Sequence, residues 1–227
     1  MTTRKPLEAC EMCGKKPKRK GRGSRKGGSF ERNVSKQLSL WRTEGSRDNI
    51  YWRAISSGGK FTVEEKKGVH SNKRHIGDLT SIDPLGDWLI DYFAFECKRY
   101  ENLYMEDIVY GPPTPEKPRG LIAFWQKHIA LSKAHNKVPI MLVKEDYKPA
   151  IVVLEPIVLL EFFRNSEGLK FGNKDIKVFD FDNLSMAIIE HEYFFESISY
   201  SEYHEISVSN LKLPREIVAP AYGGVQK

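Results

Sequence analysis

The sequence lacks the features that would place it in a membrane or an oxidising compartment. Among its 227 residues no stretch approaches the ~20 consecutive apolar residues that a helix needs to cross a bilayer, so we expect no membrane association. The first residues, MTTRKPLEAC, have no apolar run behind their charges, so we expect no secretory signal. Three cysteines are too few for a disulfide framework. These absences predict a cytoplasmic protein.

Acidic residues are also scarce at the amino-terminal end, where positive charge is concentrated. Residues 1–28 carry ten Lys or Arg and two Glu, a net charge of +8, although the whole chain carries +6. A segment of this composition cannot bury a core, so we expect a flexible tail that either contacts a polyanion such as nucleic acid or only solubilises the chain. Cys10 and Cys13 form half of a zinc-site pattern, and both zinc binding and spare thiols stay open.

Beyond the tail, the apolar pattern predicts alternating helices and strands. A helix is expected to begin near Ser29, and its apolar stripe comprises Phe30, Val34, Leu38 and Trp41. The other expected elements are strands at 49–55, 75–82 and 88–98, a helix at 118–137, strands at 138–146 and 149–156, a helix at 157–165, a strand at 175–181 and a helix at 183–198. This order predicts the α/β class, with a mixed sheet flanked by helices.

Three segments are therefore expected along the chain. Residues 1–28 form the basic flexible tail, residues 29–164 form the core, and residues 165–227 form a C-terminal extension that packs on the core. Within the core, the loop SSGGK at residues 56–60 has glycines that let the backbone approach a ligand closely. Its polar side chains add hydrogen-bond donors, although most such runs are only turns.

Two acidic residues and a lysine are placed together by the expected strands at 75–82 and 88–98. The segment DPLGD, residues 83–87, is a strong turn signal between them. If the strands form an antiparallel hairpin, Asp78 and Glu96 lie nearly opposite each other, because each is nine residues from Asp87. The period of two along a strand puts Lys98 on the same face, and it turns the apolar face toward the core.

Two neighbouring carboxylates are costly unless a cation neutralises them, and Mg²⁺ prefers oxygen ligands. We therefore predict that Asp78 and Glu96 bind Mg²⁺, for which Mn²⁺ can substitute, with the backbone carbonyl of Cys97 as a further ligand. Lys98 would polarise the attacking water or offset transition-state charge. Glu31, in the first turn of the expected helix, could hold a second metal or a water. The alternative for Asp78, Glu96 and Lys98 is a cross-strand salt bridge.

The pattern G-D-(x17)-E-C-K, after a helix carrying Phe30-Glu31-Arg32 and an S-S-G-G loop, resembles the PD-(D/E)XK nuclease superfamily. The order is most similar to archaeal Holliday junction resolvases of the Hjc type and to related phage and restriction-like endonucleases. The resemblance covers about residues 27–154. Gly77 stands where such proteins usually have proline before the aspartate, and the chain is much longer than a minimal resolvase.

This resemblance implies a restriction-endonuclease-like fold and a Mg²⁺-dependent endodeoxyribonuclease without a small-molecule cofactor. It implies that Asp78 and Glu96 bind the metal, that Lys98 is catalytic and that Glu31 is the helix-borne acid of the site. Substrate contacts are expected from Arg53, Ser56, Ser57, Lys60 and Arg99, with Tyr100 beside Arg99 at the strand end.

The expected partners are DNA and a second copy of the chain, because resolvases of this type cut paired strands as C2 dimers. The expected location is the cytoplasm of a bacterium or of a phage-infected host cell. Two other functions stay open. One is a catalytically inactive nucleic-acid-binding module with a nuclease-like fold. The other is a phage packaging or interaction protein whose C-terminal part is the partner surface.

Overall fold

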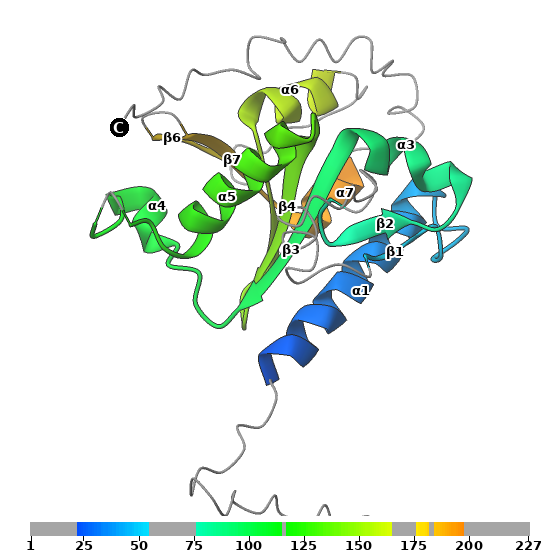
Figure 1. Ribbon diagram of the computed structural model, residues 1–227, viewed down its shortest axis with the longest axis horizontal. Coiled ribbons are helices and arrows are strands. Elements are labelled where there is room, and N and C mark those ends of the chain that lie inside the picture. Colours follow the sequence, from blue (N-terminus) through cyan, green and yellow to red (C-terminus); the bar gives the residue numbers. More distant parts are fainter. Residues whose placement is uncertain (1–21, 55–75, 115–116, 165–175, 182–183, 198–227) are drawn as a thin grey trace, which may run out of the picture.

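A five-stranded mixed sheet with helices on both faces organises the described part of the chain in a computed structural model (Figure 1). The structure describes residues 22–54, 76–114, 117–164, 176–181 and 184–197. Its elements are α1 (Arg22–Arg42), β1 (Tyr51–Arg53), β2 (Leu79–Ser81), α3 (Pro84–Tyr92), β3 (Phe93–Tyr100), α4 (Glu106–Tyr110), α5 (Gly120–Ala134), β4 (Val138–Glu145), β5 (Ala150–Leu154), α6 (Pro156–Arg164), β6 (Ile176–Phe181), β7 (Leu184–Glu190) and α7 (His191–Ser197).

The main sheet has the strand order β3-β4-β5-β7-β6. β3 pairs with β4 in parallel, and the other neighbouring strands pair antiparallel. A small antiparallel ladder of β1 and β2 lies beyond β3, to which it is joined by a parallel bridge between Gly77 and Phe95. The predicted α/β class with a mixed, helix-flanked sheet is confirmed, and it is consistent with a restriction-endonuclease-like fold.

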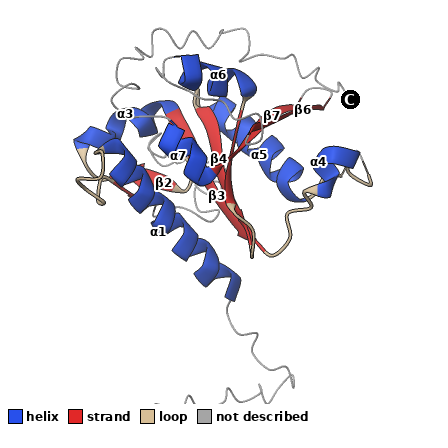
Figure 2. Cartoon of the chain, turned by 180° about the vertical axis from the view of Figure 1, so that it is seen from behind, coloured by secondary structure: helices blue, strands red, loops and turns tan. Residues whose placement is uncertain are grey.

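Apolar side chains fill both sides of this sheet. Along β4, Ile140 and Leu142 belong to the core that α1, α3, α6 and α7 cover, whereas Met141 and Val143 belong to the core under α5. Figure 2 shows α1 and α7 on the near side of the sheet and α5 behind it. Because β4 is covered on both faces, it reads as a continuous apolar run rather than an alternating one.

α1 begins at Arg22, more than a turn before the predicted start near Ser29. Phe30, Val34 and Leu38 are buried along its inner face, as the helical spacing predicts. The additional turns make a tertiary contact, because Lys26 forms an ion pair with Asp146 just after β4. Contacts of this kind stabilise a helical turn whose glycines alone would disfavour it.

Ser39 attaches the first strand to α1. Its hydroxyl oxygen accepts the backbone N–H groups of Ile50 (3.0 Å) and Tyr51 (2.9 Å), and the Ser39 side chain is fully buried. A buried hydroxyl with these partners fixes the start of β1 against the helix.

The predicted hairpin between residues 75–82 and 88–98 is wrong, because α3 occupies the segment between β2 and β3. Asp83 is the N-cap of α3, and its Oδ1 accepts the N–H of Leu85 at 2.9 Å. Pro84 then takes the first helical position, which suits its fixed φ and missing N–H. The segment DPLGD is therefore a helix start rather than a turn.

The helix predicted over residues 183–198 is wrong in its first half, where β7 (Leu184–Glu190) forms before the short α7. β7 pairs with both β5 and β6, and its apolar residues alternate between the two core clusters, so they are buried on both faces of the sheet. This double burial conceals the period-two pattern that would identify an exposed strand. The boundary predicted at residue 165 stays a prediction, but the central sheet continues past it through β6 and β7.

Candidate active site

Gly77 brings the chain into contact with the edge of β3. Its φ is +98°, and a Cβ atom at this position would lie 2.4 Å from the carbonyl oxygen of Phe95. Proline, whose φ is fixed near −65°, cannot adopt this conformation, and any side chain would collide with β3. The glycine that replaces the usual proline is thus required by this close approach.

Asp78 is consequently bound to β3 through its backbone and its side chain. Its N–H donates to the carbonyl of Phe95 at 2.6 Å, and its carbonyl accepts the N–H of Ala54 at 2.7 Å. Its Oδ2 accepts the backbone N–H of Cys97 at 2.8 Å. The Asp78 side chain therefore has a fixed position beside the middle of β3, although no hairpin places it there.

Glu96 and Lys98 project from the opposite face of β3 to Phe95 and Cys97, as the period of two predicts. Their side chains form an ion pair in which the Lys98 ammonium donates to Glu96 Oε1. Burial disfavours the ammonium, but the charges of Glu96 and Asp78 outweigh it and raise the pKa of Lys98 above its usual value. Lys98 is therefore a cation at neutral pH.

The Asp78 carboxyl lies in surroundings that disfavour its charged form. Burial, followed by the nearby charge of Glu96, raises the pKa of Asp78 to about 7, although Lys98 and the Cys97 N–H act in the opposite direction. The carboxylate of Glu31 also contributes to the increase. Burial and two neighbouring carboxylates, Glu96 and Glu31, thus disfavour the charge on Asp78, and a cation beside them would be stabilising.

Glu31 reaches this place from α1. Its Oε2 lies 3.2 Å from Arg53 Nε, and it is buried without a hydrogen bond from any residue that the structure describes. The Arg53 guanidinium lies close against α1, because a Cβ atom at Gly28 would be 3.0 Å from Arg53 Nη1. Arg53, predicted to contact substrate, is thus held by Glu31. We call the Glu31, Asp78 and Glu96 side chains the carboxylate cluster.

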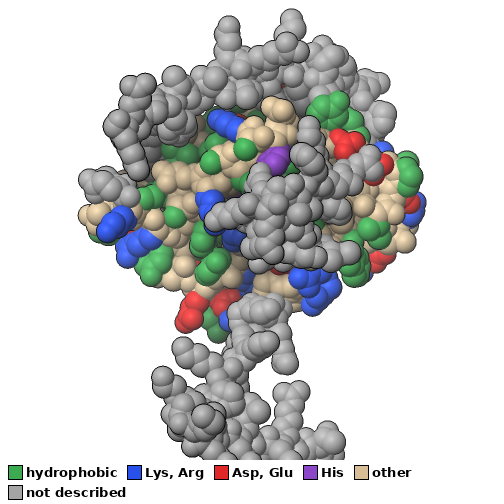
Figure 3. Space-filling view, in the orientation of Figure 1, with side chains coloured by type: hydrophobic (Ala, Val, Ile, Leu, Met, Phe, Trp, Pro, Cys, Tyr) green, Lys and Arg blue, Asp and Glu red, His purple; other side chains and the backbone are tan. Residues whose placement is uncertain are grey.

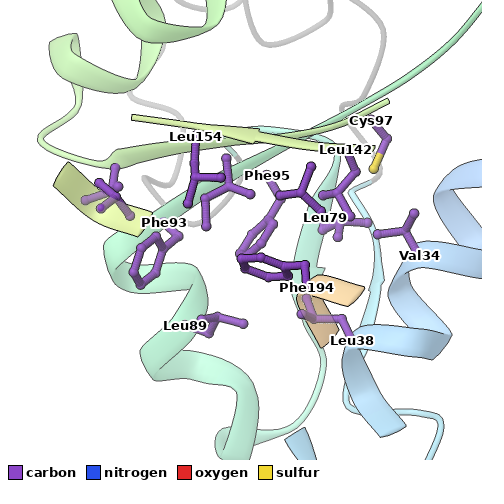
Figure 4. Packing of buried hydrophobic residues seen from close by; sticks show 14 of the residues in the cluster. Val34, Leu38, Leu79, Leu89, Phe93, Phe95, Cys97, Leu142, Leu154 and Phe194 are labelled. Carbon is purple, nitrogen blue, oxygen red and sulfur yellow. The ribbon is translucent and has the colours of Figure 1, made fainter. Parts of the chain in front are cut away.

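Cys97 contributes its backbone rather than its thiol. The thiol belongs to the core cluster with Val34 and Leu142 (Figure 4), and burial raises its pKa well above the usual value, so it stays protonated. The N–H and C=O of one strand residue point to the same side of the strand. Since the Cys97 N–H points to Asp78, the Cys97 carbonyl faces the same place.

Arg99 lies on the other face of β3, where its Nε is 3.0 Å from Asp146 Oδ1. The ammonium of Lys26 binds the same carboxylate, and these two hydrogen bonds lower the pKa of Asp146 below its usual value. On the face drawn in Figure 3, Lys and Arg side chains are scattered among other types rather than gathered into one patch. Ser56, Ser57 and Lys60, together with Cys10 and Cys13, lie outside the described residues.

α5 supplies neighbours of the site that the sequence did not reveal. His128 Nε2 lies 3.0 Å from the carbonyl oxygen of Ala94 and 3.1 Å from that of Ile140, so it joins β3 to β4 two residues before Glu96. Phe124, one helical turn earlier, lies under Lys98, whose Nζ is 6.0 Å from its ring centroid. The sequence shows that Phe124 and His128 are one helical turn apart, but it does not show which face of α5 lies against β3.

The oxygen atoms of the Asp78 and Glu96 carboxylates and of the Cys97 carbonyl are of the kind that binds a hard divalent cation with few protein ligands. Among the residues that the structure describes, no three His, Cys, Asp or Glu side chains form a metal-binding group. Two carboxylates and one backbone carbonyl nevertheless form an all-oxygen set, which Mg²⁺ accepts because it keeps several of its waters. The residues present therefore fit this cation in kind.

A model of the family described as "Phage putative PDDEXK endonuclease" matches residues 22–201, which is most of the chain. The chain belongs to this family. The predicted PD-(D/E)XK superfamily is thereby confirmed, whereas the Hjc-like specificity stays a prediction. This PDDEXK chain matches neither a curated protein nor a solved structure. None of its described helices is long and apolar enough to cross a membrane.

Proposed function

We propose that this PDDEXK chain is an endodeoxyribonuclease that depends on a divalent metal ion, Mg²⁺ in the cell, and hydrolyses DNA phosphodiester bonds. The observation that carries the proposal is the position of Asp78. A glycine contact binds it to β3 beside Glu96 and Lys98, and burial among carboxylates raises its pKa to about 7. A buried aspartate with a raised pKa destabilises the fold, so its presence is better explained by a functional role than by stability.

The oxygen atoms of Asp78, of Glu96 and of the Cys97 carbonyl would hold the metal ion. When bound, a metal ion here would lower the pKa of water and offset charge on the scissile phosphate. The bond from the Cys97 N–H to Asp78 Oδ2 supports this role, because Oδ1, which accepts no hydrogen bond from the described residues, would then be the atom that binds the ion. Little rearrangement of β3 is then required.

Lys98 would act on the phosphate. In the structure its ammonium is held by Glu96. With Glu96 bound to a cation, Lys98 would lose its strongest partner and could donate to the phosphate oxygen or hold the attacking water. In the metal-free protein the charges of Glu96 and Asp78 raise the pKa of Lys98, so it is in the donating ammonium form before substrate binds.

Glu31 would complete the site from α1 by accepting a hydrogen bond from the attacking water. Its buried Oε2 has no hydrogen-bond donor among the described residues, and Arg53 holds it at the rim. Arg53, Arg99 and the loop residues Ser56, Ser57 and Lys60 would contact the DNA backbone. The basic residues 1–28 would add affinity that falls with salt concentration.

We further propose that the substrate is branched DNA, with a four-way junction as one form, and that a C2 homodimer cuts paired strands. The expected place of action is the cytoplasm of a bacterial or phage-infected cell.

The proposal is tested by incubating the purified protein with four-way, flapped, single-stranded and linear duplex DNA, with and without Mg²⁺. Asp78→Ala, Glu96→Ala and Lys98→Ala should each abolish cleavage while the circular dichroism spectrum stays unchanged. Glu192→Ala on α7 and Lys127→Ala on α5 change exposed charges outside the carboxylate cluster and serve as controls. Metal-dependent cleavage that survives Asp78→Ala and Glu96→Ala would refute the assignment.

One observation favours the alternative of an inactive nucleic-acid-binding module. Among the described side chains no three-member metal group is already assembled. An inactive module would bind the same DNA panel and leave every strand intact at any Mg²⁺ or Mn²⁺ concentration. A packaging or interaction protein would use its C-terminal part to bind a protein partner, which a pull-down with the full chain would detect.

A further inference from the structure

Two aromatic rings form a ledge directly beside Lys98. Tyr100, at the end of β3, stacks on Phe124 of α5 with ring centroids 4.8 Å apart and an angle of 25° between the ring planes. Lys98 Nζ lies 6.0 Å from the centroid of the same Phe124 ring. Since Lys98 and Tyr100 are two residues apart on one strand, both project from the same face. The aromatic ledge, Tyr100 on Phe124, therefore adjoins the proposed catalytic group.

The ledge is exposed but firmly supported. Tyr100 is 44% exposed, so a large part of its ring meets solvent. Its backbone pairs with Glu145 of β4, and its carbonyl accepts the N–H of Asp146 at 2.9 Å. The Asp146 side chain is itself bound by two cations, as described above. An exposed ring on a fixed backbone, supported from behind by a second ring, loses little freedom when it binds a flat ligand.

We propose that the aromatic ledge stacks an unpaired nucleobase next to the scissile phosphate, so that the substrate class is DNA with an unpaired nucleotide at the cleavage site. This inference rests on the proposed nuclease function. It defines a specificity residue, Tyr100, that distinguishes single strands, flaps and open junction centres from intact duplex.

The geometry carries this choice of ligand. Along β3, Tyr100 lies about 7 Å beyond Lys98, from the rise of two strand residues. If Lys98 binds the scissile phosphate, the base of an adjoining nucleotide reaches the ledge. Among the described residues Phe124 is the ring that stacks on Tyr100, so the opposite face of Tyr100 can accept one more ring, and every base has a flat face that stacks on an aromatic side chain. In intact duplex both faces of each base are already stacked, so a duplex offers the ledge no ring unless a base is extruded.

The test measures binding without cleavage, with Ca²⁺ in place of Mg²⁺. The probes are two sets, a single-stranded oligonucleotide and a flapped duplex, in which the fluorescent base 2-aminopurine occupies each unpaired position in turn, and a linear duplex of the same sequence. We expect the wild-type protein to quench 2-aminopurine in both unpaired probes. Tyr100→Ala should abolish the quenching and raise Kd for these probes about tenfold, with Kd for the duplex unchanged.

Matched variants separate stacking from simple packing. Tyr100→Leu keeps an apolar cover on Phe124 but removes the aromatic face, so it should behave like Tyr100→Ala. Tyr100→Trp should restore quenching. Tyr110→Ala removes another exposed tyrosine, on α4, and should change nothing. The melting temperature of each variant shows whether it is folded.

The proposal is wrong if Tyr100→Leu retains quenching, if Tyr100→Ala weakens duplex and unpaired probes equally, or if no probe is bound. Because these measurements need no cleavage, they are independent of the nuclease test. Loss of quenching in Tyr100→Leu with unchanged DNA cleavage in Asp78→Ala would retain the ledge and reject the catalytic assignment. Intact quenching in Tyr100→Leu with abolished cleavage in Asp78→Ala would do the reverse.

Discussion

The side chain of Asp78 accepts a hydrogen bond of 2.8 Å from the backbone amide of Cys97, although 19 residues and a complete helix separate them. This bond attaches the aspartate to the strand that carries Glu96 and Lys98. The arrangement has a price in stability, because burial beside Glu96 raises the pKa of Asp78 to about 7. Asp78 is therefore fixed by a hydrogen bond at a position where its charged form is destabilised.

Asp78→Asn should separate catalysis from stability. The asparagine keeps an oxygen acceptor for the Cys97 N–H, but it carries no charge to be destabilised by burial and by Glu96. Without divalent metal we expect a melting temperature equal to or above that of the wild type, with DNA cleavage reduced ~100-fold or more. Differential scanning fluorimetry and a cleavage assay measure both effects. A clear fall in melting temperature would show that the Asp78 charge stabilises the fold.

The stability of the metal-free protein should depend on pH through Asp78. Its pKa is raised from 3.8 to about 7 on folding, so its protonated form stabilises the folded state at low pH. This contribution is lost as the pH rises from about 4 to 7 and amounts to ~2–4 kcal/mol. Urea unfolding of wild type and Asp78→Asn at several pH values measures it as a difference.

The comparison of wild type with Asp78→Asn is needed because two histidines change the free energy of unfolding with pH in the opposite direction. Burial lowers the pKa of His191 to about 4 and also lowers the pKa of His128, so each favours folding at high pH and loses this effect as the pH falls. Both histidines are present in wild type and in Asp78→Asn, so their contributions cancel. If the two proteins show parallel pH profiles, the aspartate is not perturbed.

Gly77→Ala should displace Asp78. The new Cβ atom would lie 2.4 Å from the Phe95 carbonyl oxygen, and φ at this position is +98°. Gly45 is the matched control, because its φ is +84° but a Cβ atom there would contact nothing within 4 Å. Gly45→Ala therefore reports backbone strain alone, ~1–2 kcal/mol. We expect Gly77→Ala to cost clearly more in chemical unfolding and also to weaken Mn²⁺ binding, which Gly45→Ala should leave intact.

Lys98→Met should have opposite effects on metal binding and on cleavage. Removing the ammonium frees Glu96 and removes a positive charge from the carboxylates, so Mn²⁺ should bind more tightly in isothermal titration calorimetry. Cleavage should be lost, because the Lys98 ammonium no longer donates to the scissile phosphate. Weaker Mn²⁺ binding would mean that Lys98 organises the carboxylates rather than competing for them.

The sequence predicts those features of the site that depend only on the periodic pattern within one strand or helix. The period of two along β3 correctly put Glu96 and Lys98 on one face and Cys97 on the other. The grouping with Asp78 was anticipated from a hairpin that does not exist. Asp83 and Pro84, read as a turn, instead cap α3, and the parallel contact at Gly77 places the aspartate.

Other features depend on tertiary contacts that no local pattern contains. The early part of α1 contacts Asp146 through Lys26, across 120 residues of sequence. Leu184–Glu190 is a strand because β5 and β6 flank it. The ledge on Tyr100 was not foreseen because it needs the face that α5 turns toward β3, and helical spacing alone leaves that rotation undetermined.

The most direct test of the central claim is the location of Mn²⁺ by anomalous diffraction from crystals of the full chain grown with saturating Mn²⁺. The account predicts one strong anomalous peak within bonding distance of Asp78 and Glu96 carboxylate oxygens, about 2.0–2.3 Å. The same peak should be missing from crystals of Asp78→Asn. A saturated crystal with no density between these two residues, or with the ion bound elsewhere, would contradict it.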